Sequence, residues 1–216
     1  MLVREVMTMD PVTVASDVSV PDALALMREK KVRRLPVLDA KKRLVGIVSD
    51  KDLLYASPSP STSLNVWEIH SLLSKLTIDK VMTRDVVTIV EDTPVEQAAR
   101  ILAEKKIGGL PVMRGADLVG IITETDIFSA FTELLGERRH GVRIYATTSG
   151  EKGTVAKVAG AIFAAGGDIV GLATAEAKLG GVVRWTITVK VQDVPRDKLV
   201  AAVKGTVLEI LDVRES

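Results

Sequence analysis

The sequence contains no cysteine, and only two of its 216 residues are histidines, His70 and His140. The absence of cysteine excludes disulfide bonds and thiolate metal sites. Two histidines also argue against a histidine-based metal centre, and neither has an identifiable catalytic partner in the sequence. We therefore predict no bound metal, no obligatory cofactor and no enzymatic activity.

Excess charge of one sign and long apolar runs are absent as well. Lysine and arginine number 29 and aspartate and glutamate 28, a formal net charge of +1, which gives no electrostatic argument for nucleic acid or an anionic membrane as partner. No apolar run approaches the roughly 18 residues of a membrane span, and the N-terminal residues do not resemble a secretory signal. We expect a cytoplasmic protein that binds neither nucleic acid nor membrane.

What the sequence does contain is an internal repeat, in which residues 13–52 recur with changes at 88–126. The offset between the copies is 75 residues at the start and 74 towards the end, so one residue is lost in a turn. A unit of about 55 residues buries too little surface to be comfortable alone, and two copies are too few for a solenoid. The repeat predicts two similar units packed face to face around a pseudo-two-fold cleft.

Each copy is expected to fold as strand, helix, strand, strand, helix. In the first copy the strands are predicted at residues 11–15, 37–38 and 44–48, and the helices at 21–30 and 49–55. Residues 57–63 are polar and contain prolines, which is typical of a linker. Residues 64–76 carry apolar side chains at helical spacing, and Trp67 is interpreted as the packing anchor of this connector helix.

The last third of the chain has a different pattern. Strands are predicted at residues 142–147, 168–177, 182–191 and 206–213, and helices around 155–163 and at 195–204. In the third of these strands, residues 183, 185, 187, 189 and 191 are apolar and alternate with polar ones, which predicts one buried face. The order βαββαβ is the ferredoxin-like arrangement. The expected fold class is thus α+β (mixed α/β): two β-α-β-β-α units and a C-terminal ferredoxin-like domain.

The same hydroxyl and carboxylate occur in each copy, as Ser49 with Asp52 and as Thr123 with Asp126. A hydroxyl at a helix start, with free N–H groups behind it, can bind a phosphate oxygen. A carboxylate one turn further on can accept hydrogen bonds from both hydroxyls of a ribose. The same spacing is also a plain N-capping pattern. The two interpretations are compatible, because a capped helix start can still face a cleft.

Two glycines and two apolar triplets complete the repeated motif. Gly46 and Gly120 lie within predicted strands, where glycine is tolerated if another backbone or a ligand comes close. The Leu-Pro-Val triplets at residues 35–37 and 110–112 are interpreted as apolar walls for a base.

These motifs resemble the CBS domain, over residues 1–57 and 78–137, with 58–77 as linker and connector helix. The resemblance implies an adenosine-type ligand (AMP, ADP, ATP or S-adenosylmethionine) in the cleft between the copies. The aspartate would bind ribose and the hydroxyl phosphate, and the strands of Thr13 and Thr88 would lie near the base. The implied nucleotide-binding residues are Thr13, Val14, Arg33, Arg34, Leu35, Pro36, Ser49 and Asp52, with Thr88, Ile89, Gly108, Gly109, Leu110, Pro111, Thr123 and Asp126.

The copies differ in the two residues that precede the Leu-Pro-Val triplet. The first copy has Arg33 and Arg34, whereas the second has Gly108 and Gly109. Arginine binds phosphate oxygens well, so the first site, that of Ser49, is expected to bind the more highly charged ligand. The alternative is that both arginines are solvated surface cations.

Residues 141–216 resemble an ACT domain, by element order and by the segments 153–155 and 167–169. The resemblance implies an amino-acid-like effector bound at a pairing interface, near Gly153, Thr154, Asp168 and Ile169. The alternative is an ACT fold used only for dimerisation. The whole CBS–CBS–ACT series is similar to the acetoin-utilisation B-type proteins.

The leading functional hypothesis is a ligand-sensing regulator that controls a separate enzyme in trans, because no catalytic domain is attached. A homodimer is expected, since CBS pairs and ACT sheets both assemble in these families. Two alternatives remain open: an interaction scaffold with vestigial sites, and a sensor of S-adenosylmethionine.

Overall fold

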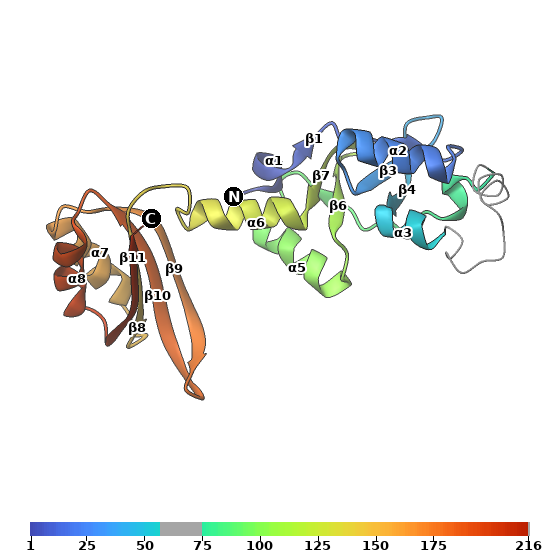
Figure 1. Cartoon of the computed structure of the whole chain (residues 1–216). Helices are drawn as coiled ribbons and strands as arrows, with labels where there is room; N and C mark the ends of the chain where they lie inside the picture. The colour runs from blue at the N-terminus through green and yellow to red at the C-terminus, as the bar shows by residue number, and fades with distance from the viewer. Residues whose placement is uncertain (57–74, 216) are drawn as a thin grey trace. The chain divides into compact units, whose positions relative to one another are not determined.

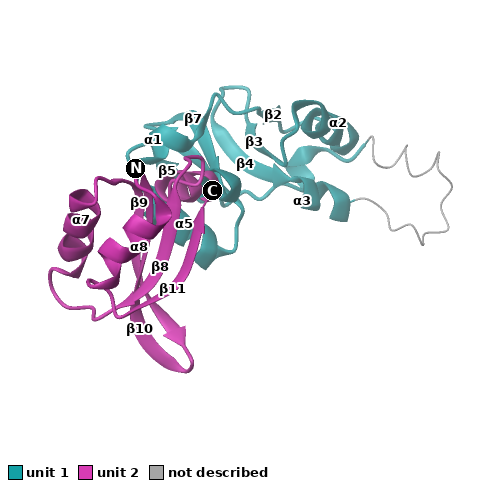
Figure 2. Ribbon diagram, turned by 60° about the vertical axis from the view of Figure 1, so that its left-hand side comes forward, with its two compact units in different colours: residues 1–127 teal, residues 128–216 magenta. Residues whose placement is uncertain are grey.

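The computed structural model describes residues 1–56 and 75–215 of the chain. They form two compact units, residues 1–127 and 128–216 (Figure 2). The predicted linker at 57–63, most of the predicted connector helix, and the side chains of Trp67 and His70 lie outside the described residues. The boundary between the units, at residues 127 and 128, lies inside α6 (Glu124–Leu134). The expected domain division at residues 137–141 stays a prediction.

The first copy of the repeat builds a three-stranded sheet in the order β2-β3-β4. Its strands are β2 (Val14–Ala15), β3 (Arg34–Leu38) and β4 (Leu44–Ser49), with β2 parallel and β4 antiparallel to β3. Helix α2 (Val20–Lys30) connects β2 to β3, and α3 (Asp50–Tyr55) follows β4 (Figure 1). Ser19 caps α2 by accepting the N–H of Asp22, and Lys31 ends it in the left-handed conformation.

The second copy repeats this arrangement with one additional strand. Its sheet has the order β1-β7-β6-β5, built from β1 (Thr8–Met9), β5 (Ile89–Val90), β6 (Gly109–Arg114) and β7 (Asp117–Thr123). Helix α5 (Val95–Lys105) connects β5 to β6, and α6 follows β7. A short element precedes each copy: α1 (Val3–Val6) before the first and the 3-10 helix η1 (Ile78–Lys80) before the second.

The segments that lead into the two copies are exchanged. β1, from the start of the chain, pairs antiparallel with β7 of the second copy. Conversely, Thr83, just before the second copy, exchanges two backbone hydrogen bonds of 2.9 and 3.0 Å with Ile47 in β4 of the first copy. We call residues 1–12 and 78–87 the leading segments. Each of them lies against the sheet of the other copy.

The strand glycines are explained by this exchange. A Cβ added at Gly46 would overlap the side chain of Met82 and lie 3.2 Å from the carbonyl oxygen of Thr83. A Cβ at Gly120 would meet the first leading segment in the same way, 3.1 Å from the carbonyl oxygen of Thr8. The prediction that another backbone comes close to these glycines is confirmed.

The second unit has the predicted order strand, helix, strand, strand, helix, strand. Its elements are β8 (Val142–Thr148), α7 (Thr154–Ala164), β9 (Asp168–Leu179), β10 (Val182–Gln192), α8 (Arg196–Lys204) and β11 (Glu209–Glu215). The sheet is antiparallel throughout, in the order β11-β8-β10-β9. Both helices cover one face, where Val158, Ile162, Leu199 and Val203 pack on Ile144 and on neighbouring residues of β8 and β10.

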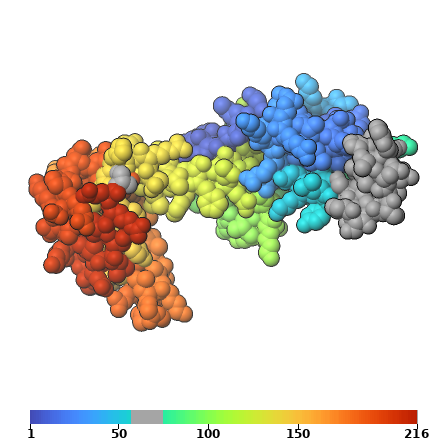
Figure 3. Space-filling view, viewed as in Figure 1, coloured from blue at the N-terminus to red at the C-terminus, as the bar shows by residue number. Residues whose placement is uncertain are grey.

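The predicted alternation along β10 is right only for its second half, where Ile187, Val189 and Val191 are buried. Val183 and Trp185 have the same parity but are 62% and 43% exposed. The reason is that the β9–β10 hairpin extends past the two helices (Figure 1) and projects from the unit in the space-filling view (Figure 3).

The opposite face of the sheet is not solvated along its whole length. Lys190, expected to face solvent, is only 2% exposed. It pairs with Gly171 in β9, and a Cβ on Gly171 would run into the backbone of Leu135 and Gly136. The turn after α6 therefore covers this part of the sheet.

Candidate functional site

Two clefts lie between the copies within residues 1–127, and each is built from both copies. We name them after the hydroxyl residue of the repeated motif. The Ser49 cleft has a volume of about 380 Å³ and the Thr123 cleft of about 360 Å³. The Ser49 cleft is lined by Arg34, Ile47, Ser49, Lys51, Asp52, Thr83, Asp85, Val86, Val87, Lys106, Ile107, Gly108, Gly109 and Glu124. The Thr123 cleft is lined by Thr8, Asp10, Pro11, Val12, Lys31, Val32, Arg33, Arg34, Ile121, Thr123, Thr125 and Asp126.

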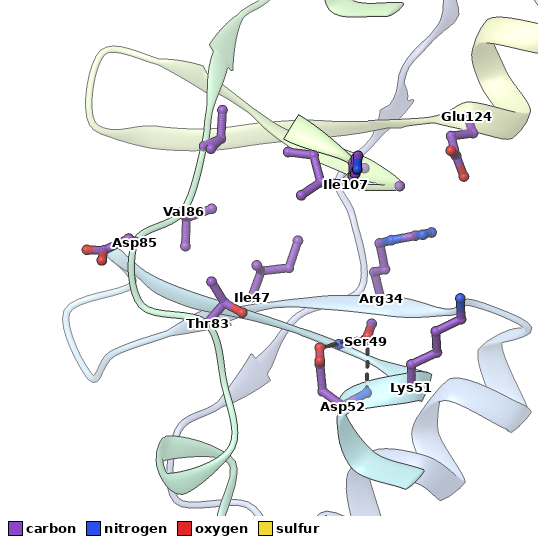
Figure 4. Close-up of a pocket in the computed structure, with 14 residues that line it drawn as sticks. Arg34, Ile47, Ser49, Lys51, Asp52, Thr83, Asp85, Val86, Ile107 and Glu124 are labelled. Atoms are coloured by element: carbon purple, nitrogen blue, oxygen red, sulfur yellow. Dashed lines mark hydrogen bonds between the residues drawn. The ribbon is translucent and has the colours of Figure 1, made fainter. Parts of the chain in front are cut away.

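The repeated hydroxyl and carboxylate interact at the start of a helix in both copies. Ser49 is the N-cap of α3, and Asp52 Oδ2 accepts hydrogen bonds from the Ser49 N–H at 2.8 Å and from its Oγ at 2.7 Å (Figure 4). Asp126 Oδ2 accepts from the Thr123 N–H and from its Oγ1, both at 2.8 Å. The capping interpretation of the motif is therefore confirmed.

Capping occupies only one oxygen of each carboxylate. Within residues 1–56 and 75–215, no donor is hydrogen-bonded to Oδ1 of Asp52 or of Asp126. Both side chains are half-buried and line their clefts. A ligand hydroxyl can thus reach Oδ1 while Oδ2 keeps the cap, because a carboxylate has acceptor capacity for about four hydrogen bonds.

The exchange of the leading segments corrects the sequence-based pairing of site residues. Arg33 lines the Thr123 cleft and not the Ser49 cleft with which it was grouped. Gly108 and Gly109 line the Ser49 cleft instead. Each motif faces the leading segment and the loop after the first helix of the other copy, so the distinguishing residues of one copy serve the cleft of the other.

Arg34 lines both clefts. A Cβ on Gly108 would overlap the guanidinium of Arg34, and a Cβ on Gly109 would lie 3.1 Å from Arg34 Cδ. The two glycines therefore leave the space through which this side chain crosses to the second copy. In the close-up of the Ser49 cleft, Arg34 extends towards the end of the cleft where Lys51 and Glu124 lie (Figure 4).

Several residues predicted as ligand contacts lie behind the clefts rather than in their walls. Leu35 and Leu110 are fully buried, and Val14 and Ile89 are buried in the cores of the two copies. None of the following lines either cleft: Thr13, Val14, Leu35, Pro36, Thr88, Ile89, Leu110 and Pro111. Leu35, Pro36, Leu110 and Pro111 belong to the central strands β3 and β6, where their buried side chains are used for packing. Thr13 and Thr88 precede the edge strands β2 and β5, and Thr88 is exposed.

The apolar walls come from residues that the sequence analysis did not select. Ile47, Val86 and Ile107 line the Ser49 cleft, whereas Pro11 and Val12 contribute to the Thr123 cleft. The predicted walls, the Leu-Pro-Val triplets at residues 35–37 and 110–112, line neither cleft. Val12 and Val86 lie one and two positions before Thr13 and Thr88, the residues expected near the base. The recurrence of Thr8 and Asp10 at positions 83 and 85 was a usable signal, since all four residues line clefts.

The second unit has a pocket of its own, which we call the Trp185 pocket, of about 510 Å³. Gly153 and Thr154, two of the predicted effector residues, line it, whereas Asp168 and Ile169 do not. The indole of Trp185 occupies the space in which a side chain on Gly150 would lie. The remaining walls are mainly apolar and include Val155, Ala156, Ala159 and Ile187.

Two kinds of feature are absent from the described ranges. Residues 1–56 and 75–215 contain no group of three or more histidine, aspartate or glutamate side chains placed to hold a metal ion. In the same ranges, no helix is long and apolar enough to cross a membrane.

Comparison with known proteins identifies the repeated unit. Residues 3–59 and 78–133 match the family model of the CBS domain. The chain belongs to the CBS domain family. A CBS domain-containing protein of Dictyostelium discoideum is 30% identical over 135 residues, 62% of this chain and 93% of the relative. The L-aspartate semialdehyde sulfurtransferase of Methanocaldococcus jannaschii is 31% identical over 133 residues, but the match spans only 23% of that enzyme.

Solved CBS structures match the same part of the chain. The CBS domain pair of protein MJ0100, in complex with 5′-methylthioadenosine and S-adenosyl-L-methionine, has a TM-score of 0.52 at 29% identity and covers 64% of this chain and 98% of its own. CBSX2 in complex with AMP has a TM-score of 0.50 at 36% identity and the same coverage. A Vibrio cholerae protein assigned to acetoin utilization (AcuB) has a TM-score of 0.53 at 33% identity, over 64% of this chain and 95% of its own.

Proposed function

We propose that this protein is a regulatory sensor that binds an adenosine-type ligand in the clefts between its CBS domains. The observation that carries the proposal is that, among residues 1–56 and 75–215, no donor is hydrogen-bonded to Oδ1 of Asp52 or of Asp126, while each side chain lines a cleft that also offers apolar residues and cations. CBS pairs with AMP or with S-adenosyl-L-methionine support the ligand class, since their structures are similar to this one.

The chemistry of adenosine matches the three kinds of wall. In the Ser49 cleft, the ribose hydroxyls would donate hydrogen bonds to Asp52. Ile47, Val86 and Ile107 would cover the faces of the base, because an aromatic ring gains most from apolar contact when it is removed from water. Lysine and arginine side chains at the rim would interact with phosphate, when the ligand carries it.

For the second unit we propose an ACT domain that binds a small amino-acid-like effector in the Trp185 pocket. The element order and the position of Gly153 and Thr154 in the wall of this pocket support the proposal. The apolar character of the other walls favours an effector with an apolar side chain. The alternative is a fold used only for dimerisation, in which case added amino acids would leave the unit unchanged.

The output of such a sensor would be control of a separate enzyme in trans, by a cytoplasmic homodimer. A dimer is supported by large apolar side chains left exposed on the β9–β10 hairpin, Val182, Val183 and Trp185, since exposed apolar patches mark interaction sites. The similarity to AcuB makes an enzyme of acetoin utilization one candidate target.

Calorimetry on the dialysed full-length protein tests the function. AMP, ADP, ATP and S-adenosylmethionine are titrated separately, with CMP as a control that keeps ribose and phosphate but replaces the purine. We expect micromolar binding of at least one adenosine compound and none of CMP. No heat with any adenosine compound, together with a stable complex with a partner protein in pull-downs, would instead support a scaffold with vestigial sites.

A further inference from the structure

Each cleft is lined by cations that do not line the other, and one cation lines both clefts. Arg33 lines only the Thr123 cleft, and its Nη2 lies 3.5 Å from Oγ1 of Thr125. Lys51 lines only the Ser49 cleft. Arg34 lines both clefts, because it stands at the start of β3, between them.

The guanidinium of Arg34 is available for a ligand. Within residues 1–56 and 75–215, no carboxylate forms an ion pair with it, since the ion pairs of these ranges involve other side chains. Its position over Gly108 places it in the Ser49 cleft in this structure. Because Arg34 also lines the Thr123 cleft, rotation about its side-chain bonds can turn the guanidinium towards that cleft.

The charge of each cleft depends on where this guanidinium points. The Ser49 cleft has three lining carboxylates, those of Asp52, Asp85 and Glu124, and only two cations besides Arg34. The Thr123 cleft has two lining carboxylates and two cations besides Arg34. Without Arg34 the Ser49 cleft carries an excess of negative charge, which opposes a phosphate.

We propose that Arg34 couples the two clefts: its guanidinium serves a phosphorylated ligand in one cleft at a time, so two such ligands bind with negative cooperativity. The inference rests on the proposed function. The Thr123 cleft fills first because it also has Arg33, and the Ser49 cleft then binds its phosphorylated ligand without Arg34. A phosphate-free ligand such as 5′-methylthioadenosine makes no use of Arg34 and fills both clefts independently.

The size of the effect follows from the interaction that is lost. A hydrogen bond to a charged group contributes enough to change affinity roughly 10-fold or more. We therefore expect AMP to bind the Ser49 cleft at least about 10-fold more weakly when the Thr123 cleft already holds AMP than when the Thr123 cleft is empty. Linkage makes the coupling reciprocal, so each ligand weakens the other by the same factor.

The experiment is calorimetry with AMP on the full-length protein and three variants. Asp126→Asn weakens AMP binding in the Thr123 cleft, so that AMP binds the Ser49 cleft while the Thr123 cleft is still empty. Its amide oxygen keeps the cap on the Thr123 N–H. In this variant the Ser49 cleft should bind AMP about 10-fold more tightly than the second site of the parent. In Arg34→Gln protein, adding Asp126→Asn should leave the affinity of the Ser49 cleft unchanged.

Two controls separate the possible failures. Arg33→Gln should weaken only the first AMP site. The parent should bind 5′-methylthioadenosine in both clefts, and the affinity of its Ser49 cleft for this ligand should be the same in Asp126→Asn protein. Equal AMP affinity of the Ser49 cleft with and without Asp126→Asn, or loss of all AMP binding in that variant, would overturn the coupling while leaving the proposed function intact. A folded parent protein that binds neither AMP nor 5′-methylthioadenosine would refute both.

Discussion

Replacing Asp52 by asparagine or by alanine separates the two roles assigned to this side chain. In the parent, one oxygen caps α3 through the Ser49 N–H and Oγ, and the other is left for a ligand. Asparagine keeps an acceptor for the cap but replaces the second oxygen by an NH₂ group, which donates instead of accepting. Alanine removes both functions.

The magnitudes differ enough to be measured separately. Loss of an N-terminal capping interaction costs about 1 kcal/mol, which lowers the Tm of a unit of 127 residues by roughly 2–6 °C. Asp52→Ala should show this decrease, and Asp52→Asn should stay within about 1 °C of the parent. Loss of hydrogen bonds from ribose to a charged carboxylate costs about 1.5–3 kcal/mol, a decrease in affinity of roughly 10- to 150-fold.

The assay combines thermal unfolding of the ligand-free proteins with calorimetry against AMP. Both variants should lose affinity at the Ser49 cleft, and Asp126→Asn, the matched control, should lose it at the other cleft. The reasoning is refuted if Asp52→Asn binds AMP as tightly as the parent at both sites, because Asp52 would then be a helix cap and nothing more.

Four further experiments test other parts of the structure. Gly46→Ala should destabilise the first unit by about 1–3 kcal/mol through overpacking against the second leading segment. Gly160→Ala in α7, whose added Cβ meets no atom within 4 Å, should raise the free energy of unfolding by up to about 1 kcal/mol. If chemical unfolding gave the same change in this free energy for both glycine variants, the two predictions would be contradicted. Two hydrogen bonds from Arg114 hold the pKa of Glu91 below its ordinary value. Arg114→Gln should therefore reduce the free energy of unfolding at neutral pH, and the reduction should shrink as the pH falls through the lowered pKa of Glu91. A difference in this free energy between parent and variant that persists in acid would argue against this interpretation. With the other tryptophan replaced by phenylalanine, the fluorescence of Trp185 should change on addition of leucine or phenylalanine, and an unchanged spectrum would favour a pocket without an effector.

The order of elements and the helix starts could be predicted from the sequence because both depend on local chemistry. Apolar spacing located α2, β4 and the helices of the second unit to within a few residues. The interaction of Asp52 with Ser49 followed from residues three positions apart.

The composition of each cleft could not be predicted, and the reason lies in the repeat itself. Thr8 and Thr83 are equivalent residues, and so are their partners Ile121 and Ile47. Either leading segment could pair with either sheet as far as local sequence is concerned. The structure contains the exchanged pairing, which moves Arg33 to the cleft of Thr123.

The buried Lys190 shows a similar limit. Alternation along β10 assigned it to a solvated face, but a turn more than fifty residues earlier in the chain covers that face at Gly171. Local periodicity shows which residues of a strand share a face, but it does not show what packs against each face.

The central claim, an adenosine-type ligand held in the two clefts, is tested most directly by photoaffinity labelling with 8-azido-AMP and peptide mapping by mass spectrometry. We predict labelled peptides from the lining segments of the clefts, residues 8–12, 31–34 and 121–126 or residues 47–52, 83–87 and 106–109. Labelling should disappear with excess AMP and be reduced at one cleft by the corresponding aspartate-to-asparagine variant. Label that maps elsewhere, or that AMP does not displace, would contradict the account.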